Sequence, residues 1–587
     1  MSWLTASPAA SWPFEEIVLF DFEFYQPGGE LPYVLCLVAR GLRSGRVVRL
    51  WRDSLVSATG PPFSTGPETL WVAYFSSADA GCFLELGWPL PQKVLDLFSE
   101  FRVATNGLPT PCGNGLLGAL TYYGLSGMAA QEKASMRALA LRGSIYTEGE
   151  QRMLLDYCKS DTTALEQLLR AMAPTIDLAR GLLRGRFMNA VARMERVGVP
   201  IDTDSLATLR ELWPEIQGEL IARIDQDYGV YEGLSFRRDR FEMYLRRNGI
   251  PWPRLPSGAL SLTEEDFRDQ TRAYAVLRPL HEARIALAQM RRLGLEIGAD
   301  GRNRVLMSPF ASKTGRNQPS NSKFIFGPAT WVRFLIRPSP GWGLAYIDFS
   351  QEEFAIAGAL SEDRNMMEAY ANGDPYLSLA ILAGAAPPGA TKESHGAIRE
   401  RFKTMTLAVQ YGGGVGLIAL RTGLPEAYAR ELLRHHQRGF SRYWEWSEAV
   451  LNYGSLKGHL DTVFGWRLHV TADPHRALGP NPRSLVNFPT QGNGAEVLRL
   501  ACIFATEAGI RVCCPVHDAL LIEAPLEQLD EAIAVTRRAM ADASKIVLNG
   551  FEIRTDVKII RFPARFSDPR GTRMWDTVWQ IIRERQR

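Results

Sequence analysis

The sequence contains, at residues 345–353, the stretch AYIDFSQEE and, at residues 511–523, the stretch RVCCPVHDALLIE. In the first, an apolar run predicts a strand that ends at Asp348, followed by a polar turn into a helix. In the second, two apolar runs flank His517 and Asp518, which predicts two strands joined by a tight turn. One aspartate in a turn is usually only a turn residue. Two strand-borne aspartates on either side of a cationic helix indicate a functional site.

That helix is predicted at residues 392–411. Arg399, Lys403, Leu407 and Tyr411 follow one another in steps of four, which at ~3.6 residues per turn keeps them on one face. Such a face suits a triphosphate at one end and a base at the other, because cations stabilise charge on a departing pyrophosphate and Tyr411 offers a stacking surface. Taken alone, this helix would be interpreted as an amphipathic helix with a solvated cationic edge.

A second ordered set of acids lies in the first part of the chain. Asp21 and Glu23 are two residues apart at the end of an apolar strand, so their side chains point to one face. Asp79 follows, and then Tyr157 and Asp161, whose four-residue spacing places them on one helix face. Each acid alone would be a turn or surface residue. Together they indicate a metal site, because neighbouring like charges repel and a divalent cation is a common remedy.

Length and composition limit the classes of protein to which this chain can belong. At ~150 residues per folding unit, 587 residues leave room for roughly four units or two large domains. The 67 basic and 64 acidic residues give a net charge of +3, which excludes a histone-like polycation but not a local nucleic-acid surface. Seven cysteines without CxxC spacing argue against a zinc or disulfide framework. Neither a signal peptide nor a membrane span is predicted, so we expect a cytoplasmic protein.

The pattern along the chain predicts three regions. Short strands near residues 17–20, 33–38 and 47–51 precede helices at residues 90–172, which predicts an α/β domain over residues 1–175. Residues 176–300 are almost wholly helical. Their basic segment at residues 236–247 is interpreted either as a solvated face, which is favoured for any one arginine, or as an arm that grips phosphates. Residues 301–587 alternate short strands with long helices.

The acidic set of the first domain resembles the 3′–5′ exonucleases of the DEDD type. The resemblance implies a ribonuclease H-like mixed sheet with helices, in which Asp21, Glu23, Asp79 and Asp161 hold two Mg²⁺ or Mn²⁺ ions and Tyr157 orients the attacking water. Many relatives carry His-Asn-x-x-x-Asp at the third position, whereas this chain has YFSSAD at residues 74–79. Asp96 is therefore a rival for Asp79.

The remaining motifs resemble family A (DNA polymerase I-like) DNA polymerases of bacteriophage type. They occur in the family's order: TGR at residues 314–316, Asp348 with SQEE, the 392–411 helix, Arg483 with Asn487 and Gln491, and His517-Asp518. The resemblance implies a right-hand polymerase of the α+β class, with a thumb-like subdomain at residues 176–300 and palm and fingers at residues 301–587, the fingers spanning roughly 355–480. No 5′ nuclease domain is expected.

By this resemblance, each motif residue has an expected role. Asp348, Asp518 and the main-chain carbonyl of Phe349 would hold two Mg²⁺ ions, with Mn²⁺ as a substitute. Lys403 is the expected phosphate contact and proton donor, and Glu353 would exclude a 2′-hydroxyl. The expected nucleotide-binding residues are Arg399, Lys403, Leu407, Tyr411, Gln351 and Glu353, and the expected DNA-binding residues are Arg316, Arg483, Asn487, Gln491 and His517.

The expected function is template-directed extension of a DNA primer with dNTPs, combined with 3′–5′ proofreading, in phage DNA replication. We expect a monomer that binds primer–template DNA and no membrane; accessory replication proteins are not predicted. Three motif positions depart from the family: Ala519 replaces the Glu of His-Asp-Glu, Leu407 replaces Phe or Tyr, and Tyr376 replaces His. Two alternatives stay open, a single-subunit RNA polymerase relative and a catalytically silent DNA-binding protein. Glu353 argues against the first and the acidic sets against the second.

Overall fold

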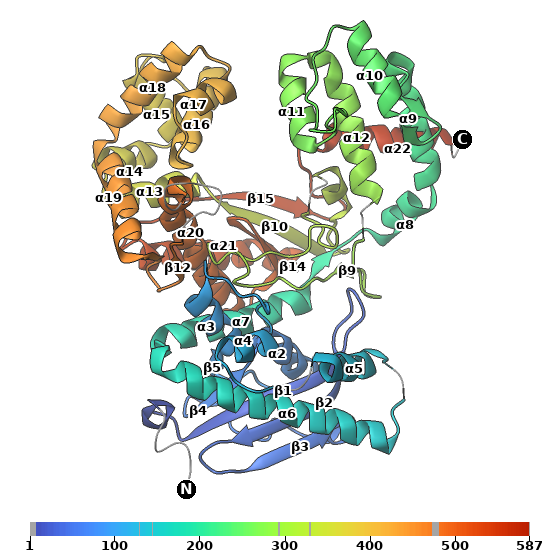
Figure 1. Cartoon of the computed structure of the whole chain (residues 1–587), viewed down its shortest axis with the longest axis vertical. Coiled ribbons are helices and arrows are strands. Elements are labelled where there is room, and N and C mark those ends of the chain that lie inside the picture. The colour runs from blue at the N-terminus through green and yellow to red at the C-terminus, as the bar shows by residue number, and fades with distance from the viewer. Residues whose placement is uncertain are drawn as a thin grey trace. The chain divides into compact units, whose positions relative to one another are not determined.

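The chain forms two compact units. The computed structural model describes residues 8–127, 130–143, 145–291, 294–327, 330–471 and 481–585 (Figure 1). The first unit contains Met1–Gly198, Leu306–Gln318 and Leu344–Ile559, and the second contains Val199–Val305, Pro319–Gly343 and Ile560–Arg587. Within the described ranges, no helix combines the length and apolar character that crossing a membrane requires.

The N-terminal part of the first unit is built on a five-stranded mixed sheet of order β3-β2-β1-β4-β5. Strand β1 pairs antiparallel with β2 and parallel with β4. It is buried on both faces, since Ile17 and Leu19 pack into one core cluster and Val18 and Phe20 into another. Two-sided burial explains its continuous apolar run. The strands are β1 (Glu16–Tyr25), β2 (Tyr33–Gly41), β3 (Val47–Trp51), β4 (Thr69–Ala73) and β5 (Lys93–Asp96).

Helices cover both faces of this sheet. Helix α6 lies across β1 and β2 (Figure 1) and packs Leu165 and Leu168 into one cluster, while α2 packs Phe83 into the other. A capping box between Thr147 and Glu150 fixes the start of α6. The helices are α1 (Arg52–Ser57), α2 (Ser76–Glu85), α3 (Leu97–Thr105), α4 (Leu116–Tyr122), α5 (Ala130–Leu141), α6 (Glu148–Met172) and α7 (Leu178–Val197).

A second sheet has the order β13-β14-β10-β15. In the β13–β14 hairpin, Val516 pairs with Ala519, so His517 and Asp518 form a two-residue turn in which His517 has φ 58°. The Phe349 N–H donates to the Asp518 carbonyl over 3.1 Å, which ties the end of β10 to that turn. The strands are β10 (Trp342–Phe349), β13 (Arg511–Val516), β14 (Ala519–Pro525) and β15 (Thr555–Arg561); β11 (His459–Asp461) and β12 (Arg467–His469) form a separate hairpin.

Helices of the same unit surround this sheet. Helix α13 leaves the end of β10, and α20, which carries Pro489 in its interior, packs against both α13 and α21. Helices α15 to α18 pack on one another (Figure 1). Their bounds are α13 (Glu352–Ser361), α14 (Arg364–Ala371), α15 (Pro375–Leu382), α16 (Gly396–Gln410), α17 (Val415–Thr422), α18 (Glu426–Gly439), α19 (Ser441–Lys457), α20 (Pro482–Glu507) and α21 (Leu529–Val547).

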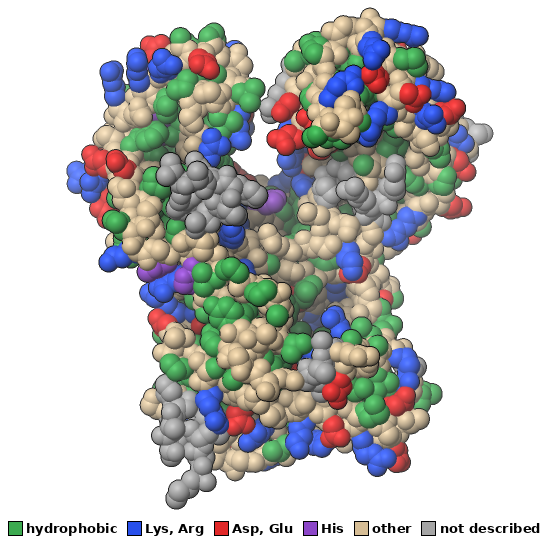
Figure 2. Space-filling view, viewed as in Figure 1, with side chains coloured by type: hydrophobic (Ala, Val, Ile, Leu, Met, Phe, Trp, Pro, Cys, Tyr) green, Lys and Arg blue, Asp and Glu red, His purple; other side chains and the backbone are tan. Residues whose placement is uncertain are grey.

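The second unit is mainly helical. Its basic segment forms ion pairs: Arg237 with Glu232 over 3.0 Å, and Arg246 with Glu242 over 2.9 Å. On the face shown in Figure 2, basic and acidic side chains are interspersed over these helices, which supports the interpretation as a solvated face. The elements are α8 (Thr203–Glu211), α9 (Trp213–Tyr228), α10 (Arg238–Arg247), α11 (Glu264–Ala273), α12 (Arg278–Arg291), α22 (Thr572–Arg585), and the short strands β6 (Val199–Pro200), β7 (Tyr231–Glu232), β8 (Ser235–Phe236) and β9 (Arg302–Asn303).

The compact units depart from the predicted ranges at α7, at Pro319–Gly343 and at the C-terminal residues. Helix α7 follows the predicted boundary at residue 175 but belongs to the first unit, because its buried side chains, such as Phe187 and Met188, make it pack on α2, β5 and α20. Residues 560–587 belong to the second unit, where α22 packs on α9. The assignment of the ranges as exonuclease, thumb, palm and fingers stays a prediction.

Candidate active sites

The first candidate site lies where β10 ends beside the β13–β14 turn. The carboxyl groups of Asp348 and Asp518 interact there, and burial, together with the Asp518 charge, raises the pKa of Asp348 to about 8. The Oδ1 atom of Asp348 is buried without a hydrogen-bond partner. The structure thus brings together two aspartates that lie far apart in the sequence.

A third aspartate belongs to this site and was not predicted. Asp556, on β15, accepts a hydrogen bond of 2.6 Å from the Ser350 hydroxyl, and its charge also raises the pKa of Asp348. Ser350 is held in turn by its neighbours, since its carbonyl accepts from the Tyr370 hydroxyl over 3.0 Å. Only the pairing of β15 beside β10 could have revealed Asp556, because no local motif marks it.

The residue after Gln351 was also not singled out by the sequence. Glu352 opens α13 and is 3% exposed, and its Oε1 atom has no hydrogen-bond partner. Burial and the Asp518 charge raise the pKa of Glu352 to about 8, against the opposing charge of Arg316. Gln351 itself has a buried Oε1 atom without a partner.

Several predicted nucleotide and DNA contacts meet beside these acids. The Tyr411 hydroxyl, at the end of α16, donates to Glu353 over 2.8 Å and also interacts with Gln491. Burial and the Glu353 charge raise the pKa of Tyr411 to about 12, while the charge of Arg316 opposes the rise. The structure therefore groups Glu353, Tyr411, Gln491 and Arg316.

The predicted cationic stripe of α16 divides into two parts. Arg399 is buried; its Nε donates to Asp374, and its Nη1 donates to Glu400 over 2.7 Å. Lys403 is half-buried and has no ion pair among the described residues. Lys403 is thus the stripe cation that is free to meet a phosphate, whereas Arg399 is already neutralised. Leu407 is half-buried one turn further on.

The other predicted DNA contacts lie on α20 and at the hairpin turn. Arg483, Asn487 and Gln491 are spaced by four residues along α20, so they share one face. The backbone of Arg483 packs closely against Gly412, where an added Cβ would lie 3.3 Å from the Arg483 Cα. His517 is exposed at the turn.

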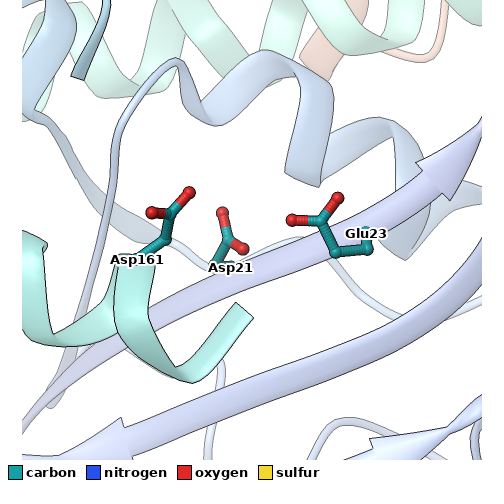
Figure 3. Close-up of side chains that lie close together, drawn as sticks. All are labelled: Asp21, Glu23 and Asp161. Carbon is teal, nitrogen blue, oxygen red and sulfur yellow. The ribbon is translucent and has the colours of Figure 1, made fainter. Parts of the chain in front are cut away.

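The second candidate site lies on the N-terminal sheet. Ligand atoms of Asp21, Glu23 and Asp161 all lie within 4.8 Å of one another (Figure 3). Asp21 and Glu23 extend from β1 on the face that α6 covers, and Asp161 comes from α6. Burial and the charge of Asp161 raise the pKa of Asp21 to about 8; burial and the charge of Asp21 raise that of Glu23.

The structure distinguishes the two rivals for the fourth acid. Asp79 lies beside β1, where its Oδ1 accepts from the Phe22 N–H over 3.1 Å, and the charge of Asp21 helps burial to raise its pKa. Asp96 is instead the N-cap of α3 and accepts from the N–H groups of Ser76 and Ser99, each over 2.6 Å. The Asp96 carboxylate therefore already accepts two backbone hydrogen bonds. Asp79 is the acid that interacts with Asp21, although it lies outside the group formed by Asp21, Glu23 and Asp161.

Tyr157 and an unpredicted lysine complete this second site. Tyr157 interacts with Asp161, and burial followed by the charge of Asp161 raises its pKa. The Lys133 ammonium, on α5, lies 3.0 Å from Asp161 Oδ2 and 5.7 Å from the centre of the Tyr157 ring. Lys133 could not be singled out from the sequence, because α5 carries no acidic or aromatic pattern that points to it.

Both sites have the chemistry that divalent cations require. Each presents closely spaced carboxylates, and each contains a buried carboxylate oxygen without a partner, Asp21 Oδ2 in one and Asp348 Oδ1 in the other. Hard cations such as Mg²⁺ prefer such oxygen ligands. Burying uncompensated carboxylates is costly, so the group formed by Asp21, Glu23 and Asp161 fits a divalent ion, and Asp348 and Asp518 offer a pair of carboxylates to one.

Comparison with known proteins places the first candidate site in a family. Residues 328–560, which contain Asp348, the α16 stripe and the His517-Asp518 turn, match DNA polymerase family A. This part of the chain is thus similar in sequence to DNA polymerases of family A. The match does not include the acidic cluster of the N-terminal sheet.

Two DNA polymerases are similar to this chain in sequence. The chain is 28% identical to the thermostable DNA polymerase I of Thermus thermophilus over 384 residues, covering 60% of this chain and 44% of that protein. It is 24% identical to the DNA polymerase of Mycobacterium phage D29 over 411 residues, covering 68% and 66%. The chain thus spans less than half the length of the first bacterial relative.

A solved polymerase structure has the same fold. It is the POL domain of Pol1 from M. smegmatis in complex with DNA primer-template and dNTP, with a TM-score of 0.71 and 17% identity, covering 95% of this chain and 97% of that one. The predicted fold, a ribonuclease H-like mixed sheet with helices followed by a right-hand polymerase, is therefore confirmed.

Proposed function

We propose that this chain is a DNA-templated DNA polymerase that extends a DNA primer with dNTPs by two-metal phosphoryl transfer. The observation that carries the proposal is the contact between Asp348 and Asp518, beside the Glu353–Tyr411 pair. The family match of residues 328–560 supports it, and the phage relative supports a role in phage DNA replication. Primer–template DNA and dNTPs are the expected partners, and the chain would act as a monomer.

The residues of the site would divide the work as follows. Asp348, Asp518 and the Phe349 carbonyl would hold two Mg²⁺ ions, which supply Lewis acidity toward the attacking hydroxyl and the leaving pyrophosphate. Lys403 would bind the phosphates and donate a proton to the leaving group, since its ammonium forms no ion pair with the described residues. Glu353, fixed by Tyr411, would lie against the sugar and favour deoxynucleotides.

Changing Asp348 to Asn tests this function. We expect primer extension to fall by more than ~100-fold, because even groups outside the metal's ligand set are worth ~10–100-fold. Duplex binding should persist, since Asp348 makes no DNA contact in the proposal. The exposed Asp542 on α21 provides the matched control, Asp542→Asn. Extension at an unchanged rate by Asp348→Asn would remove Asp348 from the active site.

We propose in addition that the N-terminal sheet carries a 3′–5′ exonuclease that removes mismatched primer ends. The group formed by Asp21, Glu23 and Asp161, with Asp79 beside β1, supports this activity. These acids would hold two Mg²⁺ or Mn²⁺ ions, and Tyr157, which contacts Asp161, would orient the water that attacks the phosphodiester.

The excision activity is tested with a mismatched primer end. Changing Asp21 and Glu23 together to Ala should abolish excision, because it removes two of the three grouped carboxylates. The exposed Asp53 on α1 gives the control, Asp53→Ala. Continued excision by the double variant would mean that the N-terminal sheet does not perform the reaction.

A further inference from the structure

Glu352 is a buried carboxylate that the assigned roles leave unexplained. It is 3% exposed, and its Oε1 atom has no hydrogen-bond partner among the residues that the structure describes. Leaving a buried carboxylate without a partner costs several kcal/mol, roughly the penalty for one desolvated ion. Such a group is retained where a cation compensates it.

The charges around Glu352 show where that cation would lie. The residues that act on it most strongly are Asp518 and Arg316, followed by Glu353 and Asp348. Arg316 is one positive charge against four carboxylates, so the described side chains leave this cluster with an excess of negative charge. The charge of Glu352 therefore acts together with those of the two strand-end aspartates, although the three carboxylates do not form a group within 4.8 Å among the described residues.

The backbone around Glu352 is shaped to admit its carboxylate. Gly494, in the middle of α20, lies so close that a Cβ there would be 3.2 Å from both Oε1 and Oε2 of Glu352. A glycine inside a helix costs ~1 kcal/mol relative to alanine. Here its missing side chain provides the room that the carboxylate occupies.

The hairpin turn lacks a second acid. Asp518 is followed by Ala519, which is fully buried and uncharged, where the family motif resembled by this segment has Glu. Glu352 approaches Asp518 from α13 instead of from the hairpin.

We propose that Glu352 is a positioning residue of the polymerase metal site, whose carboxylate supports ion binding beside Asp518 from the first turn of α13. The inference rests on the proposed polymerase function. In this inference, Glu352 takes the role that the His-Asp-Glu motif gives to the Glu of the hairpin. The missing side chain of Gly494 leaves space for the Glu352 carboxylate.

The test measures ion binding directly. Mn²⁺ titration followed by electron paramagnetic resonance is carried out on the full chain with Asp21 and Glu23 changed to Ala, so that the second acidic cluster does not contribute. Glu352→Gln keeps the shape and removes the charge; we expect the Mn²⁺ dissociation constant to rise ~10-fold or more, with a comparable fall in kcat for extension. The KM for dNTP should change less than kcat.

A second variant leaves Glu352 chemically intact. Gly494→Ala should displace its carboxylate and weaken Mn²⁺ binding, because an added Cβ would lie 3.2 Å from both carboxylate oxygens. The matched control is Gly218→Ala on α9, where an added Cβ meets nothing within 4 Å. A structural role alone would lower stability in these variants without changing Mn²⁺ affinity.

The outcomes separate the inference from the proposed function. Unchanged Mn²⁺ affinity in Glu352→Gln overturns the inference, and so does an absence of Mn²⁺ binding in the parent. If Asp348→Asn stops extension while Glu352→Gln behaves like the parent, the polymerase function stands and the role of Glu352 is refuted. If the parent binds Mn²⁺ but extends no primer, the proposed function fails, and the Mn²⁺ titrations still decide the role of Glu352.

Discussion

Lys133 is the basic residue whose charge acts on the acidic cluster of the N-terminal sheet. Its ammonium lies 3.0 Å from Asp161 Oδ2, and its charge lowers the pKa values of Asp21 and Glu23 against the effects that raise them. An ammonium in that place competes with a divalent ion for the same carboxylate. Changing Lys133 to Met should therefore raise Mn²⁺ affinity roughly five-fold, or ~1 kcal/mol for a partly exposed pair.

The measurement requires a background with Asp348 and Asp518 changed to Asn, so that only the N-terminal cluster binds Mn²⁺. Lys159→Met is the control, since Lys159 is exposed on α6 only two residues from Asp161, on another face of the helix. If Lys133→Met instead lowers Mn²⁺ affinity, the lysine supports ion binding rather than opposing it.

Single residues differ in how far the sequence reveals them. Asp348 and Asp518 are predictable as candidates because each ends an apolar run, a local pattern. Glu352 and Lys133 are not, because their importance depends on contacts with α20 and α6 that no spacing in the chain announces. Arg399 shows the reverse case: its spacing predicts a phosphate contact, yet Asp374 and Glu400 already pair with it.

At the scale of elements, α20 connects several parts of the first unit. Glu496 accepts from the Thr462 hydroxyl over 2.7 Å and forms an ion pair of 2.9 Å with Arg499, whose Nη1 donates to the Gly315 carbonyl over 2.7 Å. The side chains of the ion pair are only 6–7% exposed. This network fixes α20 to the β11–β12 turn and to the segment that carries Arg316.

Changing Glu496 to Gln should lower the free energy of unfolding by about 3–5 kcal/mol, because it leaves the buried Arg499 charge without its partner. The control is Glu507→Gln at the end of the same helix, where the pair with Arg186 is 35–41% exposed and should be worth at most ~1 kcal/mol. Urea denaturation measures the free energy of unfolding of both variants, and a comparison of their m-values checks that both unfold in the same way. Equal losses of unfolding free energy in the two variants would contradict the larger contribution that we expect from the buried pair.

The elements also show why part of the fold escapes prediction. The three antiparallel strands β1 to β3 and the β13–β14 hairpin are predicted from apolar runs and turn residues and are confirmed. The parallel strands β4 and β5 were not predicted, because each is a short, buried run that periodicity alone does not distinguish from a helix segment. Strand β15 has a half-exposed, mixed pattern and was likewise not predicted.

At the scale of the whole molecule, both acidic sites belong to the first compact unit, and the helical second unit carries neither. Asp21, Asp348 and Glu352 share one property: burial and neighbouring carboxylates raise their pKa values. Asp21, Asp348 and Glu352 each rise to about 8. The metal-free protein therefore holds protons that the unfolded chain releases at much lower pH.

This difference fixes the sign of a pH dependence. Between the ordinary values of 3.8 and 4.5 and the folded values near 8, the native state binds more protons than the unfolded state, so stability falls as pH rises. We compare pH 7.0 with pH 8.5, because the buried His436, whose pKa is lowered to about 3, opposes the trend only below the ordinary histidine value of 6.5. In EDTA, the melting temperature should be lower at pH 8.5.

Magnesium should reverse this trend, because ion binding requires the deprotonated carboxylates and stabilises the folded state in proportion to its affinity. The rise in melting temperature on adding Mg²⁺ should therefore be larger at pH 8.5 than at pH 7.0. With Asp21 and Asp348 both changed to Asn, the pH dependence in EDTA should flatten and the Mg²⁺ effect should shrink. If the melting temperature in EDTA stays level or rises between pH 7.0 and pH 8.5, these carboxyl groups are already ionised at pH 7.0. That outcome would contradict the raised pKa values of Asp21, Asp348 and Glu352.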